Sequence, residues 1–270
     1  MTLIRIGAVN YLNARPLVYG LDRQAARFSL RFDTPSRCAN LLHEGAIDVG
    51  LIPSIEYARR FDVHIPRSDY HVVSDVGIMS VGAVASVALF TSRPTSAIRS
   101  VAVDRSSRAS AALLRVLCAQ WFDIEPKFVT LSPDLGAMLK RCDAALIIGD
   151  VALFADYESD GLEKIDLGEE WTAMTSLPFV WAFWAGRPNA IGSDDIRALQ
   201  TARDEGVAVR DTVASAYYPN DEQKVKRAEQ YLRENIKYNL DELAWLGFRK
   251  FLDLATDLGI VRSNRGVQFY

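Results

Sequence analysis

Short apolar runs recur along the first part of the chain, and each has the length of a β-strand. Residues 3–9 are apolar enough to form a buried central strand, and residues 47–52 form a second run of this kind. Between them, residues 28–32 alternate apolar and polar side chains with the period of a half-buried strand. The three runs predict the first strands of one sheet.

Helix-forming segments follow the second and third of these strands. Ser36 has the side chain of a preferred N-cap, and the helix that it opens places on one face Cys38, Leu41 and Leu42. Pro53 and Ser54 open a second, shorter helix that extends through Tyr57. Strands that alternate with helices in this order predict a parallel sheet.

The alternation returns after a predicted loop at residues 91–100, which a long β-rich run at residues 81–90 precedes. Beyond the loop, the pattern predicts three strands, at residues 101–103, 127–131 and 144–148. Two helices separate them, at residues 107–121 and 133–140, and a further helix starts at Gly149 and Asp150. This second strand–helix unit resembles the first in rhythm.

The rest of the chain returns to the first unit and ends in helices. Residues 177–184 are apolar and aromatic, as expected of a returning strand, and residues 193–259 have helical spacing. We therefore predict an α/β fold of two lobes, with residues 1–91 and 185–270 in lobe I and residues 92–184 in lobe II. Two crossings between lobes make a hinge and an interlobe cleft, which is a preferred place for a small ligand.

Composition excludes several classes of function. The net charge of -3 gives no global attraction to nucleic acid. The three cysteines are widely spaced and the three histidines have no metal-ligand spacing, so we expect neither disulfides nor a metal site. The first residues lack the features of a secretory signal, and no apolar run is long enough to span a membrane. A cytoplasmic protein without a membrane partner is expected.

Small polar residues stand where predicted strands end and helices begin. In an open α/β sheet, ligands bind beyond the carboxyl ends of the strands, and the first turn of a helix attracts anions. The residues so placed are Ser36, Ser54, Ser106, Ser107, Gly149 and Asp150. Each serine could equally be a simple helix cap. Together they favour a cleft that binds a small carboxylate.

The loop after the first strand offers amides and one cation. Asn10 and Asn13 can donate hydrogen bonds into the cleft, although asparagines also form turns on their own. Arg15 could pair with a carboxylate or lie in solvent. The sequence has no GxSxG, Walker or GxGxxG motif. The residues alone therefore indicate an anion-binding protein and no particular reaction.

Six strings, in order, resemble the chorismate dehydratases, the first enzymes of the futalosine route to menaquinone. They are RIGAVNYLNARPL (residues 5–17), GLIPSIEY (50–57), GIMS (77–80), DRSSR (104–108), ALIIGD (145–150) and LPFV (177–180). The resemblance implies a type II periplasmic-binding-protein fold. It also implies conversion of chorismate, a dicarboxylate, to 3-[(1-carboxyvinyl)oxy]benzoate and water, with no cofactor.

The resemblance also assigns roles to residues. It implies that Asn13 orients the substrate and that Ser80, after the Gly-x-Met string, hydrogen-bonds the departing hydroxyl. The serines named above, with Gly149 and Asp150, would hold the two carboxylates. The Ala14-Arg15 pair is not a fixed part of the family pattern, so Arg15 has no assigned role. The family also suggests that the enolpyruvyl carboxylate of the substrate is the base.

Three other functions fit the same fold. A 1,4-dihydroxy-6-naphthoate synthase would need a basic residue such as histidine in the cleft, and the opening asparagine string favours the dehydratase. A solute-binding receptor would carry a secretory signal. A transcription-factor effector domain would follow a helix-turn-helix module. The sequence predicts no oligomeric state.

Overall fold

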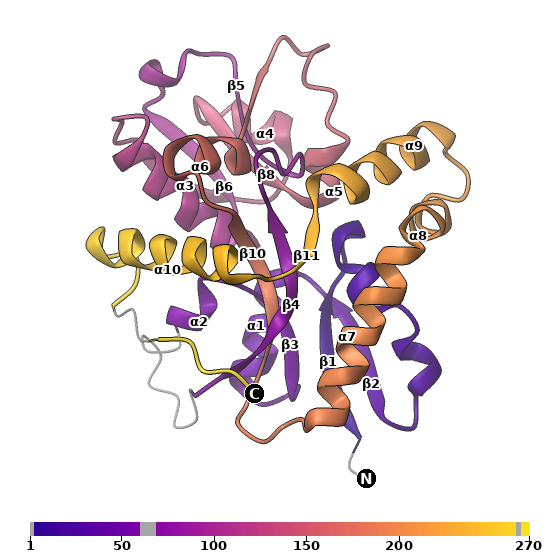
Figure 1. Ribbon diagram of the computed structural model, residues 1–270. Helices are drawn as coiled ribbons and strands as arrows, with labels where there is room; N and C mark the ends of the chain where they lie inside the picture. Colours follow the sequence, from indigo (N-terminus) through magenta and orange to yellow (C-terminus); the bar gives the residue numbers. More distant parts are fainter. Residues whose placement is uncertain (1–2, 60–68, 263–265) are drawn as a thin grey trace.

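A first sheet of six strands forms the lower lobe of the computed structural model, which describes residues 3–59, 69–262 and 266–270 (Figure 1). Its strand order is β11-β4-β10-β3-β1-β2. The strands are β1 (Ile4–Val9), β2 (Phe28–Asp33), β3 (Val49–Pro53), β4 (His71–Ser80), β10 (Phe179–Gly186) and β11 (Lys237–Asn239). The pairs β1–β2 and β1–β3 are parallel, as predicted, whereas β10 is antiparallel to both β3 and β4.

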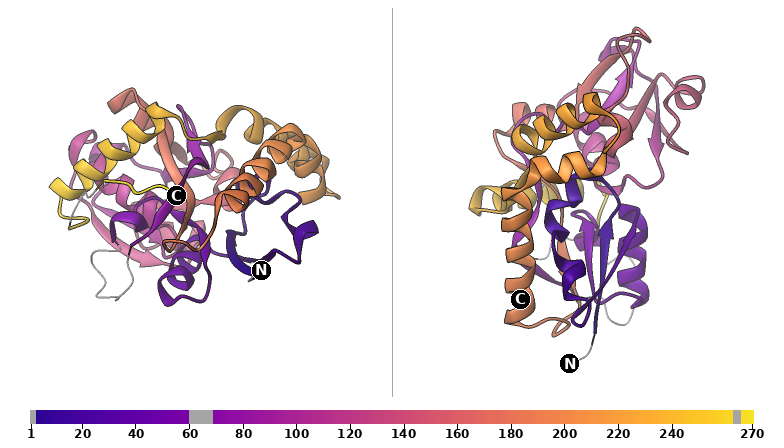
Figure 2. Two further views of the ribbon diagram at one scale, coloured as in Figure 1. Left: turned by 60° about the horizontal axis from the view of Figure 1, so that its bottom comes forward. Right: turned by 90° about the vertical axis from the view of Figure 1, so that its right-hand side faces the viewer.

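A second sheet of five strands forms the upper lobe, in the order β7-β6-β8-β5-β9. Its strands are β5 (Val87–Thr91), β6 (Ser100–Asp104), β7 (Lys127–Leu131), β8 (Ala144–Ile148) and β9 (Glu163–Asp166). The pairs β6–β7 and β6–β8 are parallel, and β5 is antiparallel to β8 and β9. The two-lobed α/β prediction is confirmed, and the view from the side separates the lobes plainly (Figure 2).

The chain passes between the sheets twice. The first passage joins β4 to β5 through residues 81–86, and the second joins β9 to β10 through α6 (Leu167–Thr175). Both passages come earlier in the chain than the predicted lobe limits at residues 91 and 185. The reason for the first lies in Gly82 and Ala85, whose positive φ values of 72° and 61° interrupt the β-rich run that we expected to be one strand.

The helices of the strand–helix units follow the prediction closely. They are α1 (Pro35–Glu44), α2 (Glu56–Arg59), α3 (Arg108–Gln120), α4 (Leu135–Leu139) and α5 (Gly149–Leu153). The cap prediction for α1 was wrong, because Thr34 occupies the N-cap position and Ser36 lies in the first turn. Proline at the first helical position explains the shift, since its ring already has the φ of a helix and its missing N–H needs no acceptor there.

Helices of the C-terminal part cover the first sheet and reach the other lobe. They are α7 (Ser193–Ala208), α8 (Arg210–Tyr217), α9 (Glu222–Gln230) and α10 (Glu242–Asp257), with a π-helical turn at Tyr231–Asn235. Strands β4, β9 and β11 were missed. The continuous burial of most of β4 gives it no alternation, and β11 has only three residues.

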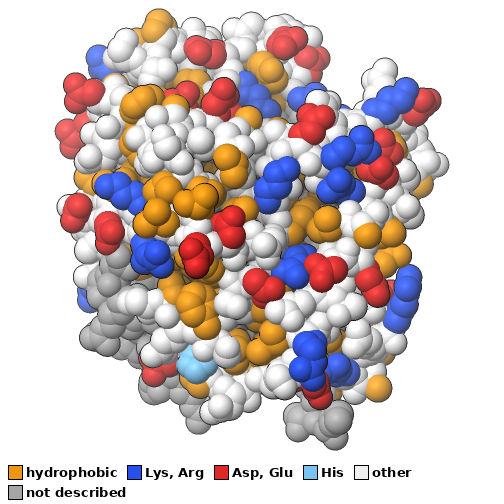
Figure 3. Space-filling view, in the orientation of Figure 1, with side chains coloured by type: hydrophobic (Ala, Val, Ile, Leu, Met, Phe, Trp, Pro, Cys, Tyr) orange, Lys and Arg blue, Asp and Glu red, His pale blue; other side chains and the backbone are white. Residues whose placement is uncertain are grey.

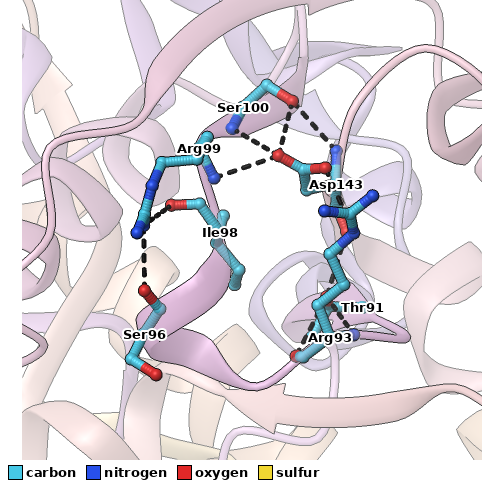
Figure 4. A network of polar contacts seen from close by, with 7 residues as sticks. All are labelled: Thr91, Arg93, Ser96, Ile98, Arg99, Ser100 and Asp143. Carbon is cyan, nitrogen blue, oxygen red and sulfur yellow. Dashed lines mark hydrogen bonds and ion pairs between the residues drawn. The ribbon is translucent and has the colours of Figure 1, made fainter.

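A network of hydrogen bonds around Asp143 joins strand ends of the second sheet (Figure 4). The Asp143 carboxylate accepts hydrogen bonds from the backbone N–H of Arg99 and of Ser100, each at 3.0 Å. Thr91 Oγ1 donates to the carbonyl of Asp143 at 3.0 Å. These bonds join the first residue of β6, the last residue of β5 and the residue before β8. The opposite ends of the same strands are left to form the interlobe site.

The distribution of charge on the surface and the character of the helices bear on binding to nucleic acid and to membranes. Figure 3 shows basic and acidic side chains interspersed over one face of the molecule, with no large region of a single charge on that face. Among the described residues, no helix has the length and apolar character that a bilayer crossing requires.

Candidate active site

A cavity lies between the lobes, at the carboxyl ends of β1, β3, β6 and β8. It has a volume of about 70 Å³. Polar side chains reach it from both lobes, and apolar side chains complete its walls. The lining residues are Val9, Tyr11, Asn13, Pro35, Pro53, Ile78, Val84, Ser86, Val87, Ser106, Ser107, Arg108, Ala109, Ser110, Ile148, Gly149, Trp181 and Ala182. The position is the one that the strand order predicted.

Asn13 and Ser86 meet at one tyrosine. Asn13 lies in a 3₁₀ turn, Leu12–Ala14, that follows β1. Its Nδ2 donates to the hydroxyl of Tyr231 at 2.9 Å, and that hydroxyl lies 2.8 Å from Ser86 Oγ. Asn13 was predicted and lines the cavity, whereas Ser86 and Tyr231 were not predicted.

The backbone that carries Ser86 is held from several sides. Asp166 accepts hydrogen bonds from the N–H groups of Val84 at 2.9 Å and Ala85 at 2.6 Å. The ammonium of Lys164 donates to the carbonyl of Ala85 at 2.6 Å. Ala85 has the left-handed φ of 61°, which costs about 1 kcal/mol or more for a residue with a Cβ. Such over-determined, strained turns cluster at functional sites.

Ser80 lies behind the cavity rather than on it. It is the last residue of β4, is fully buried and pairs with Phe179 in β10. Its Oγ accepts a hydrogen bond from Trp181 Nε1 at 3.1 Å, and Trp181 is one of the residues that line the cavity. This geometry therefore does not support direct contact of Ser80 with a substrate. It supports an indirect effect, in which Ser80 positions Trp181.

The start of α3 faces the cavity. Ser107 occupies the N-cap position, but its hydroxyl caps nothing and has no hydrogen-bond partner among the described residues, although only 3% of the residue is exposed. The first N–H groups of a helix likewise lack acceptors within the helix. Ser106 also lines the cavity, and its Oγ donates to Asp104 at 2.8 Å. The free donors and the helix dipole suit an anion.

Arg108 connects the lobes beside these donors. Its guanidinium donates to the buried Glu56 carboxylate at 2.9 Å and to Asn40 Oδ1 at 2.8 Å. His43 Nε2 lies 3.3 Å from the same carboxylate and does not line the cavity. Arg108 therefore belongs to an ion pair that crosses the interlobe boundary, with part of its side chain on the cavity wall.

Gly149 lets Tyr11 approach the second lobe. Gly149 has a φ of 69°, and a Cβ there would lie 2.9 Å from the ring of Tyr11. Its N–H donates to the carbonyl of Ser86 at 2.8 Å. Burial raises the pKa of Tyr11, so its phenol stays protonated at neutral pH. The prediction had given Gly149 a place at the substrate, and the structure does bring it to the cavity.

Asp150 has a different position from the one expected. It is absent from the cavity lining and instead accepts hydrogen bonds from the Leu12 N–H at 3.2 Å and the Tyr217 hydroxyl at 2.8 Å. Burial raises the pKa of Asp150, and these two donors oppose the rise. Asp150 thus ties the second lobe to the loop after β1 and to α8.

Three further candidate residues also lie off the cavity. Ser36 and Ser54 each follow a proline that lines it, but neither serine is part of the lining. The Ser54 hydroxyl is fully buried and has no partner among the described residues. Arg15 donates to Asn10 Oδ1 at 2.7 Å, and its guanidinium lies over the ring of Phe32 at 4.2 Å. These contacts hold the loop rather than a ligand.

The cavity carries few ionisable groups. Among the described residues that line it, only Tyr11 and Arg108 can ionise, and none is a histidine or a carboxylate. His64 lies outside the described residues. In the part of the chain that the structure describes, no cluster of three or more His, Cys, Asp or Glu side chains could hold a metal ion. The site therefore offers hydrogen-bond donors, including the unpaired hydroxyl at the start of α3, and no histidine or carboxylate among the described residues that line it.

Solved structures share the fold. A protein from Archaeoglobus fulgidus has a TM-score of 0.74 at 18% identity, covering 96% of this chain and 98% of its own. The periplasmic aliphatic sulphonate binding protein of Escherichia coli has a TM-score of 0.69 at 15% identity, with 99% of this chain and 94% of its own covered. A Candida albicans protein described as having the generic periplasmic binding protein fold has a TM-score of 0.68 at 16% identity, with coverages of 98% and 92%. The periplasmic-binding-protein fold is confirmed.

Sequence comparison identifies the family. The chorismate dehydratase of Thermus thermophilus is 27% identical over 268 residues, which cover 92% of this chain and 93% of that protein. A family model described as menaquinone biosynthesis matches residues 4–257, nearly the whole chain. The chain therefore belongs to this menaquinone biosynthesis family.

Proposed function

We propose that this protein dehydrates chorismate to 3-[(1-carboxyvinyl)oxy]benzoate and water. The observation that carries the proposal is an interlobe cavity that has unpaired donors at the start of α3, further amide and hydroxyl groups, and no histidine or carboxylate among its described lining residues. The Thermus relative, which is named a chorismate dehydratase, supports this substrate, and the family supports a role in menaquinone biosynthesis. A dehydration that uses a carboxylate of its own substrate as base needs positioning more than it needs a basic side chain.

The start of α3 is the proposed place for one carboxylate of chorismate. Ser107 Oγ and the first N–H groups of the helix are donors without protein acceptors, and a carboxylate is the natural acceptor there. Ser106, next to it, supports the tight turn through Asp104. Of the predicted carboxylate-binding serines, Ser106 and Ser107 keep this role in the proposal, while Ser36 and Ser54 do not.

Asn13 and Ser86 are the proposed residues at the reacting ring. Both line the cavity, and both lie at hydrogen-bond distance from Tyr231. Ser86 takes the role at the departing hydroxyl that the sequence had suggested for Ser80. Ser80 is assigned an indirect role, in which its oxygen fixes the Trp181 indole that lines the cavity.

In the proposed reaction, the enolpyruvyl carboxylate of chorismate removes the ring proton next to the hydroxyl. The electron pair of the broken C–H bond enters the ring, which becomes aromatic, and the C–O pair leaves with the oxygen. The abstracted proton is transferred to that oxygen, so the products are the benzoate and water. Hydrogen bonds from Asn13 and Ser86 would hold the ring and the leaving oxygen in line for this exchange.

Substrate entry requires the lobes to separate. The cavity of about 70 Å³ is much smaller than the several hundred cubic ångströms of a typical small-molecule site. Separation about the two passages between the sheets would open it, and closure would then exclude water from the reacting ring.

One assay distinguishes the proposed activity from its alternatives. The purified protein is incubated with chorismate, and loss of the diene and appearance of the benzoate are followed by chromatography. The proposal expects enzyme-dependent formation of the benzoate. Binding of chorismate without conversion would indicate a receptor, and no interaction with chorismate would indicate a different enzyme of this fold.

A further inference from the structure

Tyr231 is the shared partner of the two side chains proposed at the reacting ring. Its hydroxyl lies 2.9 Å from Asn13 Nδ2 and 2.8 Å from Ser86 Oγ, and Tyr231 and Ser86 are each only 2% exposed. Tyr231 opens the π-helical turn Tyr231–Asn235 at the end of α9. Single π-turns of this kind are frequent at functional sites. Nothing in the reaction assigned so far uses this tyrosine.

The chemistry of the three groups fixes the direction of one of their hydrogen bonds and favours one direction for the other. An amide nitrogen only donates, so Tyr231 accepts from Asn13. Either hydroxyl can donate in the bond between Tyr231 and Ser86, but only donation from Tyr231 gives the phenolic proton an acceptor among these groups. In that arrangement the proton of Ser86 is free for a third partner, and Ser86 lines the cavity. The Asn13 carbonyl oxygen is likewise left free by this arrangement.

We propose that Tyr231 is a positioning residue that orients Ser86 as a donor and Asn13 as an acceptor toward one hydroxyl group of the substrate. A hydroxyl can accept from Ser86 and donate to the Asn13 oxygen at the same time. This inference rests on the proposed function, in which that group is the departing hydroxyl of chorismate. Tyr231 itself touches no substrate and acts only through its two partners.

The surroundings keep Tyr231 in the protonated form that this role needs. Burial raises the pKa of Tyr231 well above its usual value, although its bonds to Ser86 and Asn13 oppose the rise. The carbonyl of Ala83 accepts a hydrogen bond from Asn235 at 2.9 Å, which ties the end of the π-turn to the passage that carries Ser86. The turn and the serine are therefore positioned together.

The test compares Tyr231→Phe with Tyr238→Phe. Both tyrosines are buried, but the Tyr238 hydroxyl has no hydrogen-bond partner among the described residues, so Tyr238→Phe is the matched control. Tyr231→Phe is expected to lower kcat for chorismate about ten- to a hundredfold, with KM changed less than about threefold. Tyr238→Phe is expected to keep both values. Thermal melting of each variant checks its fold.

A second pair of variants tests whether Tyr231 acts through Ser86. Adding Tyr231→Phe to Ser86→Ala should lower kcat by a smaller factor than Tyr231→Phe does in the wild type, because one of the two groups that the tyrosine orients is already absent. Asn13→Asp, whose carboxylate can only accept, reverses the first bond of the chain and should also lower kcat without any change to Tyr231.

The outcomes separate this inference from the function on which it rests. If the wild type leaves chorismate unchanged, both fail. If the wild type converts chorismate but Tyr231→Phe keeps its kcat, or if its loss multiplies with that of Ser86→Ala, the inference on Tyr231 alone is wrong. The inference is supported if Tyr231→Phe lowers kcat, Tyr238→Phe does not, and the loss caused by Tyr231→Phe is smaller in the Ser86→Ala background.

Discussion

The guanidinium of Arg108 in the upper lobe lies 2.9 Å from the buried carboxylate of Glu56 in the lower lobe. The same arginine lines the cavity beside the free donors of α3. In the proposed function, one side chain therefore takes part in both the closure of the lobes and the binding of the substrate carboxylate. This coupling suits a protein whose substrate must enter an open cleft and react in a closed one.

Arg108→Ala should weaken substrate binding. Removing the guanidinium lowers the fraction of closed protein and leaves Glu56 with fewer partners, so KM for chorismate should rise about three- to thirtyfold. Arg105→Ala is the control, because Arg105 is an exposed arginine in the same turn. Steady-state kinetics measure the effect. Equal KM values for the two variants would exclude the closure role.

Gly149→Ala should distort the cavity. A Cβ at residue 149 has both an unfavourable φ of 69° and a contact of 2.9 Å with the Tyr11 ring. Gly161→Ala is a matched control, since Gly161 has a φ of 65° and a Cβ placed there would have nothing within 4 Å. Both variants lose about 1–2 kcal/mol of unfolding free energy from φ alone. Gly149→Ala should lose more than the control and also lose turnover. If chemical denaturation gives the same loss of unfolding free energy for both variants, the contact with Tyr11 does not contribute to stability.

Asp166→Asn should slow the reaction from a distance. An asparagine presents one acceptor oxygen in place of two, so the N–H of either Val84 or Ala85 is left without its partner. We expect a loss of about 1–3 kcal/mol in unfolding free energy, the cost of an unsatisfied buried donor, and a lower kcat as Ser86 loses its position. Asp134 caps α4 without touching the cavity, so the control variant Asp134→Asn should leave kcat unchanged.

Asp143 should make stability depend on pH without affecting turnover. Hydrogen bonds, first from the Arg99 N–H, lower the pKa of Asp143 below its usual value. A carboxyl with a lowered pKa in the folded state stabilises the fold above its unfolded pKa, and this contribution disappears as pH falls through the folded pKa. Asp143→Asn should therefore be less stable than the wild type at pH 7, and the difference should shrink below about pH 4.

Denaturant unfolding at a series of pH values measures this prediction. Chorismate turnover at pH 7 should be equal in both proteins, because the Asp143 network lies at the starts of β6 and β8 and the end of β5, whereas the cavity lies at the opposite ends of these strands. A constant difference in stability from pH 7 to pH 3 would show that the Asp143 charge is not the cause.

Most strands and helices of the two lobes were predictable from the local pattern of apolar and polar residues. Strands at residues 127–131 and 144–148 match β7 and β8, because their apolar runs are short and bounded by polar residues. The positions of Ser106, Ser107 and Gly149 on the cavity were also predictable, since these residues follow strand ends, where ligands bind in this kind of sheet.

Ser86 and Tyr231 were not predictable by the same means. Asn13 and Tyr231 lie 218 residues apart in the chain, and only tertiary structure brings them together. Ser86 sat within an apolar run that looked like one strand, and two residues with positive φ turn that run into the passage between the lobes. Ser80 belongs to the recognisable GIMS string, which made it the sequence candidate. In the structure it pairs with Phe179 of β10, and its hydroxyl contacts Trp181 instead of lining the cavity.

Conversion of chorismate by the wild type, beside Asn13→Ala and Ser86→Ala, tests the central claim most directly. Chromatography should show one equivalent of the benzoate for each chorismate consumed by the wild type, and each variant should be at least about tenfold slower, as expected for lost positioning groups. Unchanged chorismate with the wild type, or equal rates in all three proteins, would contradict the account.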